Sequence, residues 1–382
     1  MDPDRPKVLS IFGTRPEAIK MAPLLKQLAQ CDKLSSVVCV TGQHREQLDQ
    51  VLDAFQLQPD FDLNLMKKGQ TLAEISSRTF AKVDEVLELV KPNLVLVHGD
   101  PSATFCAATV SFYRGIPVGH VEAGLRSGNI ESPFPEEFNR VVVDRISKLH
   151  FAPTEQNKQL LLAEGFDEAT IYVTGNTAID AINSVVDPDY RFETPLLSEL
   201  DFSKKVILLT AHRRENLGQR MRQCFRAIRR IADDHPDAVI VYPMHLNKLV
   251  RDVAVEVLGD HERIHLIEPL GYFEISNLMA RCFMVVTDSG GLQEEAPALG
   301  KPVVVMRTET ERQEAVDAGT VVIAGVEEEA VYREVDRLLC DREHYDRMAS
   351  AINPYGDGTA SRQIVSAIVS YLERGAVDGS LQ

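Results

Sequence analysis

The sequence predicts two Rossmann-like α/β domains facing a cleft, and three observations support this fold class. Short runs of β-branched residues alternate with longer segments of helical periodicity, as in parallel sheets covered by helices on both faces. This rhythm occurs twice, with a looser, proline-containing stretch at residues 183–203 between the halves. The length of 382 residues also exceeds what a single hydrophobic core comfortably holds.

The expected strands are the apolar runs of each half. In the first half they are residues 7–12, 36–40, 93–98, 116–121, 149–153 and 170–174. In the second half they are residues 205–210, 238–243, 264–268, 283–287, 302–306 and 320–324. We therefore expect an N-terminal domain over 1–182, a linker over 183–203, a C-terminal domain over 204–362, and a C-terminal helix over 363–382 that packs back on the N-terminal domain.

The composition excludes several classes of partner. A formal net charge of −16 argues against binding to nucleic acid or to an anionic membrane surface. No stretch approaches the ~20 apolar residues that span a bilayer, and residues 1–6 do not begin a signal peptide. The six cysteines are scattered without a CxxC pair, which predicts reduced thiols in a cytoplasmic protein.

Distinctive polar motifs follow the expected strands. In the first half, "FGTRPEAIK", "TGQHRE", "HGD" and "VEAG" follow the first four strands. In the second half, "TAHRREN" follows the first strand and "TDSGGLQEE" the fourth. Because parallel sheets bind ligands at the carboxyl ends of their strands, these loops are the expected binding site.

The second-half motifs favour a phosphate-bearing ligand. In "TDSGGLQEE" a helix is expected to begin near Gly290, capped by Asp288 or Ser289, with free N–H groups that suit a phosphate. An ordinary capped helix explains the motif equally well when it is taken alone. The phosphate site is favoured over an ordinary capped helix because several basic side chains lie in the strand-end loops: Arg15, Lys20, His212, Arg213, Arg214 and Arg312. Neither GxxxxGK[ST] nor GxGxxG occurs, so neither a P-loop nor an NAD site is expected, and we predict no cofactor.

The first-half motifs favour acid–base chemistry. Residues 121–140 carry several glutamates in a segment too rich in glycine and proline for a helix, and surface solvation is the simple alternative. Proton transfer at a sugar carbon uses such groups, and the candidates are Asp100, Glu122, Glu136 and His212. "HVE" at 120–122 resembles part of a zinc deaminase motif, but neither PCxxC nor HExxH occurs, so no metal is predicted.

Several motifs together resemble the non-hydrolysing UDP-N-acetylglucosamine 2-epimerases. They span nearly the whole chain in order: "GTRPEAIKMAPL", "TGQHREQLDQV", "VHGD", "VGHVEAGLRSG", "SPFPEEFNR", "TGNTAID", "TAHRRENLG", "TDSGGLQEEAPALGKPV" and "NPYGDGTAS". The resemblance implies a glycosyltransferase-B-like fold, a homodimer, and reversible conversion of UDP-GlcNAc to UDP-ManNAc for cell-surface polysaccharides. It also implies a mechanism in which UDP is eliminated to give 2-acetamidoglucal and then added back, with the C2 proton delivered to the opposite face.

The resemblance also implies roles for individual residues. Those expected at UDP are Arg15, Lys20, His212, Ser289, Gly290, Gly291, Glu295 and Arg312. Asp100, Glu122 and Glu136 match the acid–base residues, and His212 is also implicated in catalysis. Positions of a second, activating UDP-GlcNAc site in some bacterial members match Gln43, Gln70, Arg213 and His245. The chain departs from the family pattern at Gly69, Pro101, Ile275 and Gln313.

Three rival functions remain open from the sequence. A hydrolysing 2-epimerase would release ManNAc and UDP, and a glycosyltransferase would need an acceptor. A non-catalytic UDP-sugar sensor would bind without turnover, but all of the acid–base positions are filled.

Overall fold

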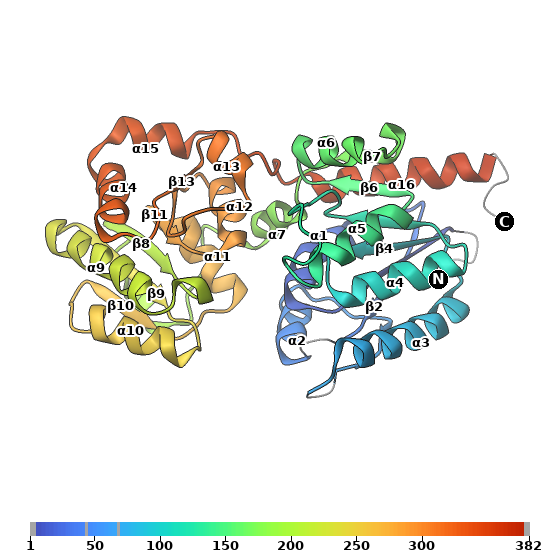
Figure 1. Ribbon diagram of the computed structural model, residues 1–382, viewed down its shortest axis with the longest axis horizontal. Coiled ribbons are helices and arrows are strands. Elements are labelled where there is room, and N and C mark those ends of the chain that lie inside the picture. Colours follow the sequence, from blue (N-terminus) through green and yellow to red (C-terminus); the bar gives the residue numbers. More distant parts are fainter. Residues whose placement is uncertain (1–4, 43–44, 67–68, 378–382) are drawn as a thin grey trace. The chain divides into compact units, whose positions relative to one another are not determined.

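The structure is a computed structural model that describes residues 5–42, 45–66 and 69–377. The chain forms two compact units: Met1–Ala181 together with Tyr355–Gln382, and Ile182–Pro354. Each unit contains one parallel sheet flanked by helices (Figure 1). The predicted fold class of two Rossmann-like α/β units is therefore confirmed.

The first unit has a seven-stranded parallel sheet in the order β3-β2-β1-β4-β5-β6-β7. Each strand except β3 corresponds to a predicted apolar run. The strands are β1 (Lys7–Phe12), β2 (Ser35–Val40), β3 (Phe61–Asp62), β4 (Leu94–His98), β5 (Val118–Val121), β6 (Leu149–Ala152) and β7 (Ile171–Val173).

Two helical layers cover this sheet (Figure 1). Helix α4 packs against α3 and α5, and α1 packs against α2 and α16. Side chains such as Leu9, Val95 and Val143 form a buried apolar cluster with α3 and α4. The helices of this part of the chain are α1 (Arg15–Gln30), α2 (Arg45–Ala54), α3 (Leu72–Val90), α4 (Ser102–Tyr113), α5 (Glu136–Ile146), α6 (Glu155–Ala163), α7 (Thr177–Val185) and α16 (Ala360–Val377), with the short 3₁₀ helix η1 (Glu168–Thr170).

The second unit has a six-stranded parallel sheet in the order β10-β9-β8-β11-β12-β13. Its strands are β8 (Lys205–Thr210), β9 (Ala238–Pro243), β10 (Ile264–Ile267), β11 (Met284–Thr287), β12 (Val303–Val305) and β13 (Val321–Ile323). Its helices are α8 (Pro195–Glu199), η2 (Arg214–Asn216), α9 (Gln219–Asp234), α10 (Lys248–Leu258), α11 (Tyr272–Arg281), α12 (Gly290–Ala298), α13 (Gln313–Asp317), α14 (Glu328–Cys340) and α15 (Arg342–Ala349). A buried apolar cluster joins the sheet to α9, α10 and α14.

The unit boundaries differ from those expected. The predicted linker, 183–203, lies in the second unit, because its backbone is bound to α11: Asn277 accepts from the N–H of Asp187 at 2.8 Å, and Arg281 donates to the carbonyl of Tyr190 at 2.8 Å. The chain returns to the first unit at Tyr355 rather than after residue 362.

Two contacts fix this return. The carbonyl of Tyr355 accepts from the N–H of Asn176 at 2.8 Å, and the carboxylate of Asp180 accepts from the N–H of Ser361 at 2.7 Å. Helix α16 then packs on α1. No helix within residues 5–42, 45–66 and 69–377 combines the length and the apolar character needed to cross a membrane.

Candidate functional site

In each sheet the strand order reverses once, between β1 and β4 in the first unit and between β8 and β11 in the second. Open parallel sheets bind ligands outside the carboxyl ends of the strands at this point. The loops that leave these strands carry most of the predicted residues. Each unit therefore has its candidate residues where its topology favours a ligand.

Glu122 follows β5 and is held by two basic groups. Its Oε2 lies 2.5 Å from the Nζ of Lys20 and 3.1 Å from the Nε2 of His98, and its side chain is 13% exposed. Burial favours a raised pKa, but Lys20 and His98 outweigh burial and hold the pKa of Glu122 well below its usual range. Glu122 is therefore a carboxylate at neutral pH.

Asp100 follows β4 and is held at its side chain and at its backbone. Arg140 forms an ion pair with its carboxylate, and the carbonyl of Asp100 accepts from the amide of Asn139 at 2.8 Å. Both partners belong to α5, so this helix orients the Asp100 loop. Pro101 is the residue before α4 and has an extended conformation (φ −61°, ψ 155°), which proline adopts without strain.

Glu136 does not lie in a loop, as the sequence suggested, but is the first residue of α5. Proline is tolerated just before a helix and in its first turn, so α5 can begin directly after Pro135, at the end of the proline-rich segment. The neighbouring Glu137 is buried and accepts from the N–H groups of Ser127 and Gly128 at 2.9 and 3.2 Å. Glu137 thus holds the preceding loop closed, whereas the Glu136 side chain is half-buried and makes no hydrogen bond with the part of the chain that the structure describes.

Arg15 is the first residue of α1, and Thr14 caps this helix in a capping box with Glu17. The Glu17 carboxylate is buried and also accepts from the Thr104 hydroxyl at 3.0 Å. Burial raises the pKa of Glu17. This network fixes the start of α1 and with it the half-buried Arg15.

His212 follows β8 and is oriented by Asp288, which follows β11. Its Nδ1 lies 3.1 Å from the fully buried Asp288 carboxylate, which also accepts from the backbone N–H groups of His212 and Arg213. Burial favours a raised pKa for Asp288, but hydrogen bonds from these groups lower it. Asp288 therefore does not cap α12, as the sequence suggested. It anchors the His212 loop, and with Nδ1 engaged the ring can use Nε2 for other contacts.

Helix α12 begins at Gly290, with Ser289 as the capping residue. The Ser289 hydroxyl makes no capping bond, so the first N–H groups of α12 are available to a ligand. The Arg312 guanidinium is beside this helix start: its Nε is 2.9 Å from Glu294, and a Cβ on Gly290 would lie 3.1 Å from its Cζ. Glu295 is half-buried in the second turn. A helix start beside a guanidinium is a good binding place for a diphosphate.

Of the residues matched to an activating site, two contact the His212–Asp288 pair in the second unit, and Gln70 belongs to the first unit. The ring of His245 stacks on that of His212, with centroids 5.7 Å apart, and burial and His212 lower the pKa of His245. Arg213 donates its Nε to the carbonyl of Asp288 at 3.3 Å. Gln70 belongs to the first unit and donates to the carbonyl of Leu65 at 3.4 Å. Gln43 lies outside the described residues.

A buried ionic network connects the first-unit loops, and no pattern in the sequence predicts it. Asp144 of α5 is fully buried; its Oδ1 lies 2.6 Å from the Nδ1 of His120, and its Oδ2 lies 2.8 Å from Arg126. Burial favours a raised pKa, but His120 and Arg126 outweigh burial and lower the pKa of Asp144 to about 2. These residues are 24 and 18 positions apart, and only the sheet order brings them together.

This network predicts a pH-dependent stability. A carboxyl whose pKa falls from its usual 3.8 to about 2 on folding stabilises the fold by about 2 kcal/mol above pH 4, and this is lost as the pH falls through about 2. We expect Asp144→Asn to be less stable than the wild type at pH 7, with a gap that narrows below pH 4. Urea unfolding at stepped pH measures this gap, and a gap that stays constant with pH would contradict the assignment.

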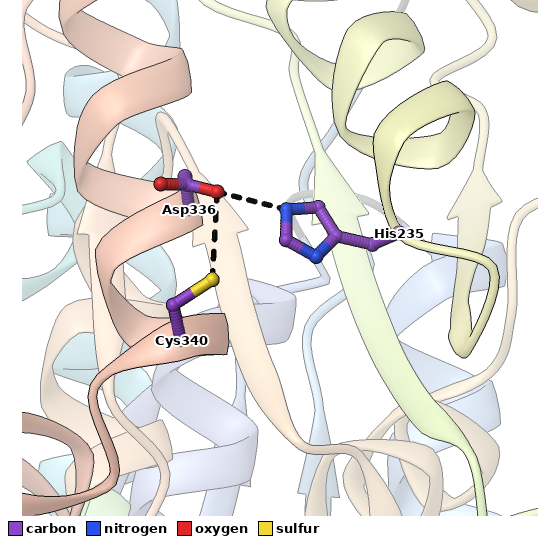
Figure 2. A group of neighbouring side chains, drawn as sticks. All are labelled: His235, Asp336 and Cys340. Carbon is purple, nitrogen blue, oxygen red and sulfur yellow. Dashed lines mark hydrogen bonds and ion pairs between the residues drawn. The ribbon is translucent and has the colours of Figure 1, made fainter.

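A group of possible metal ligands lies in the second unit, apart from the candidate site residues. Figure 2 shows the Asp336 carboxylate between the His235 ring and the Cys340 thiol, 2.9 and 3.7 Å away. This is the group among the described residues whose donor atoms are close enough to hold a metal ion such as zinc. His235 precedes β9, so the group lies at the opposite end of the strand from the candidate site. His120, in "HVE", has its two ring nitrogens occupied by Asp144 and by the carbonyl of Gly99, which leaves no free ligand atom.

The comparisons with known proteins agree with this arrangement. The sequence model of the UDP-N-acetylglucosamine 2-epimerase family matches residues 26–369. The chain is 54% identical over 363 residues to UDP-N-acetylglucosamine 2-epimerase of Bacillus subtilis, covering 95% of each chain. It is 48% identical over 369 residues to the enzyme of Escherichia coli K12, covering 95% of this chain and 98% of that one.

A solved structure of UDP-GlcNAc 2-epimerase from Neisseria meningitidis, bound to UDP-GlcNAc, is similar with a TM-score of 0.84 at 44% identity, over 95% of this chain and all of that one. Sequence, fold and the chemistry of the strand-end loops thus lead to the same assignment. The chain belongs to the UDP-N-acetylglucosamine 2-epimerase family.

Proposed function

We propose that the protein interconverts UDP-GlcNAc and UDP-ManNAc by eliminating UDP and adding it back. The observation that carries the proposal is Glu122, a buried carboxylate that Lys20 and His98 hold ionised at the ligand-binding edge of the first sheet. The Neisseria relative, which is bound to UDP-GlcNAc, supports the substrate. The product would supply the synthesis of cell-surface polysaccharides.

The chemistry explains why such groups are needed. The C2 proton of the sugar has no adjacent carbonyl to acidify it, so direct removal is costly. In the proposed reaction the C2 proton goes to an enzyme base, the C1–O bond to UDP breaks with its electron pair on UDP, and a C1=C2 double bond forms. Return of UDP to C1 and of a proton to the opposite face of C2 completes the epimerisation. The candidates for these proton transfers are Asp100, Glu122, Glu136 and His212.

We propose that the helix start and the cations bind UDP and stabilise the charge it gains on leaving. The residues in this set are Arg15, Lys20, His212, Ser289, Gly290, Gly291, Glu295 and Arg312, with Glu295 accepting from the ribose hydroxyls. Hydrogen-bond donors already in place around a group that becomes negatively charged stabilise the transition state and contribute strongly to the rate. Lys20 has a second task, because its ion pair keeps Glu122 charged.

A substitution in this set tests the diphosphate site. Gly290→Ala adds a Cβ that would lie 3.1–3.3 Å from the Arg312 guanidinium, so this group must shift by a few tenths of an ångström from the helix start. We expect UDP to bind about tenfold more weakly, a loss of about 1.4 kcal/mol, measured by calorimetry. An unchanged Kd would remove Arg312 from the site. Gly291→Ala is the control, because a Cβ on Gly291 meets nothing within 4 Å. An equal loss of UDP affinity in this variant would show that the added methyl group crowds the ligand rather than shifting Arg312.

We also propose that UDP-GlcNAc activates the enzyme at a second site that includes Gln43, Gln70, Arg213 and His245. The stacking of His245 on His212 supports this, since a ligand at His245 would act on a candidate catalytic ring. UDP-ManNAc alone is then expected to be a poor substrate until a little UDP-GlcNAc is added. Full activity with UDP-ManNAc alone and hyperbolic kinetics would contradict the activating site.

A homodimer in the cytoplasm completes the proposal. Six cysteines without a disulfide suit a reducing compartment. The exposed side chains of Leu89, Phe112 and Tyr113 support an interface on α3 and α4. Light scattering after size-exclusion chromatography measures the mass.

Product analysis of purified protein with UDP-GlcNAc tests the function. We expect UDP-ManNAc, with neither free ManNAc nor free UDP accumulating. Free ManNAc and UDP would instead identify a hydrolysing epimerase, and binding without any product would identify a sensor.

A further inference from the structure

The hub of the buried network is Asp144, which joins all of the segments that carry the candidate carboxylates. Besides His120 and Arg126, its Oδ2 accepts from the N–H of Gly124 at 3.1 Å. Gly124 follows Glu122 by two residues, and α5 itself begins at Glu136. A third connection, to the Asp100 loop, runs through His120.

His120 links the hub to the backbone next to Asp100. Its Nε2 is 2.8 Å from the carbonyl oxygen of Gly99, and its ring is fully buried. The carboxylate of Asp144 and the carbonyl of Gly99 are both acceptors, so a bridge between them through the ring requires a hydrogen on each ring nitrogen. The N–H of Gly99 donates to the carbonyl of Val121 at 2.9 Å. The peptide groups on both sides of Gly99 are thus fixed from the side of β5, the second of them being the one that leads to Asp100.

We propose that His120 is a positioning residue for the epimerisation, which holds the Asp100 loop in register with the Glu122 loop by bridging Asp144 to the carbonyl of Gly99. This inference rests on the proposed function, in which Asp100 and Glu122 transfer protons. Proton transfer needs heavy atoms within about 3 Å, and a displacement of about 1 Å can cost up to a hundredfold in rate. A rigid link between the two loops therefore acts on kcat, whereas UDP binding depends largely on other residues.

The chain offers a matched control in His150. It is buried in β6, opposite His120 in the strand register, and its Nε2 lies 2.8 Å from the carbonyl of Asp144. It thus contacts the same hub, but its other nitrogen faces Thr170 at 3.2 Å rather than a catalytic loop. A loss of packing or of buried hydrogen bonds should affect the His120 and His150 variants alike.

Two substitutions separate the two contacts of the ring. The amide nitrogen of asparagine takes about the place of Nδ1, and that of glutamine about the place of Nε2. His120→Asn therefore keeps the contact with Asp144 and loses that with Gly99, while His120→Gln does the reverse. We expect His120→Asn to lower kcat about 30-fold with KM and the Kd of UDP nearly unchanged, and His120→Gln to retain more activity. His150→Asn should lower the Tm by about as much as His120→Asn does, while its kcat stays within about twofold of the wild-type value.

Three results would overturn the proposal. The first is a kcat of His120→Asn close to that of the wild type. The second is a loss of kcat in His150→Asn as large as the loss in His120→Asn, when the two variants have equal Tm. The third needs no stable variant: NMR of wild-type protein labelled with ¹⁵N-histidine should show hydrogens on both ring nitrogens of His120, and a ring nitrogen without hydrogen would contradict the bridge. Failure of the proposed function is distinguishable, because the wild type itself would then form no UDP-ManNAc.

Discussion

Replacing Glu122 by glutamine is expected to lower kcat by about 10³-fold, the range of a lost acid–base group, and to change the Kd of UDP little. The reason is the charge of this carboxylate, which Lys20 and His98 hold ionised 2.5 and 3.1 Å away. Glutamine keeps the shape but accepts no proton. Steady-state kinetics and calorimetry with UDP measure the two effects.

Loss of stability must be separated from loss of chemistry in this variant. Glu122→Gln leaves the Lys20 ammonium, which is 18% exposed, without its carboxylate, at a cost of about 1–3 kcal/mol. The double variant with Lys20→Gln removes both charges, so we expect its stability to recover and its turnover to remain low. If turnover recovers together with stability, Glu122 is structural and does not transfer the proton.

Glu136→Gln is expected to lose most turnover, about 10²–10³-fold, while UDP binding is retained. The Glu136 carboxylate stands at the first position of α5 without a hydrogen bond to the described residues, so its replacement leaves no partner unsatisfied. Little change in Tm is therefore expected, unlike in Glu122→Gln.

The matched control is Glu131→Gln in the same acidic segment. Glu131 is exposed, its backbone N–H donates to the side chain of Asn129, and its carboxylate makes no hydrogen bond with the described residues. Wild-type turnover is expected for this variant. Near-normal turnover in Glu136→Gln as well would remove Glu136 from the mechanism and leave its segment structural.

Much of the fold could be predicted because buried parallel strands are continuous apolar runs. Strand β3 was missed: Phe61–Asp62 is only two residues long, with one exposed side chain, so no apolar run marks it. The start of α5 was also missed, since the glycines and prolines of 121–140 suggested a loop throughout. The linker prediction differed from the unit boundary because its contacts with Asn277 and Arg281 depend on residues some 90 positions away.

The candidate residues could be found from the sequence, but their partners could not. Lys20 was expected at UDP, yet its contact with Glu122 spans 102 positions and arises because β1, β4 and β5 are neighbours in the sheet. Asp288 looked like a helix cap because capping is a local pattern, while its contact with His212 joins two strands 76 positions apart. His98 is part of the "HGD" motif, but nothing in that motif marks it as a partner of Glu122, and Asp144 belongs to none of the motifs.

The measurement that tests the central claim most directly is the fate of the C2 hydrogen during turnover in D2O. Purified protein is incubated with UDP-GlcNAc, and the sugar nucleotides are analysed by NMR and mass spectrometry. We predict that UDP-ManNAc appears with deuterium at C2, because the proton removed by the enzyme exchanges with solvent before UDP returns. UDP-ManNAc that forms without deuterium at C2, or free ManNAc and UDP in its place, would contradict elimination and re-addition by these carboxylates.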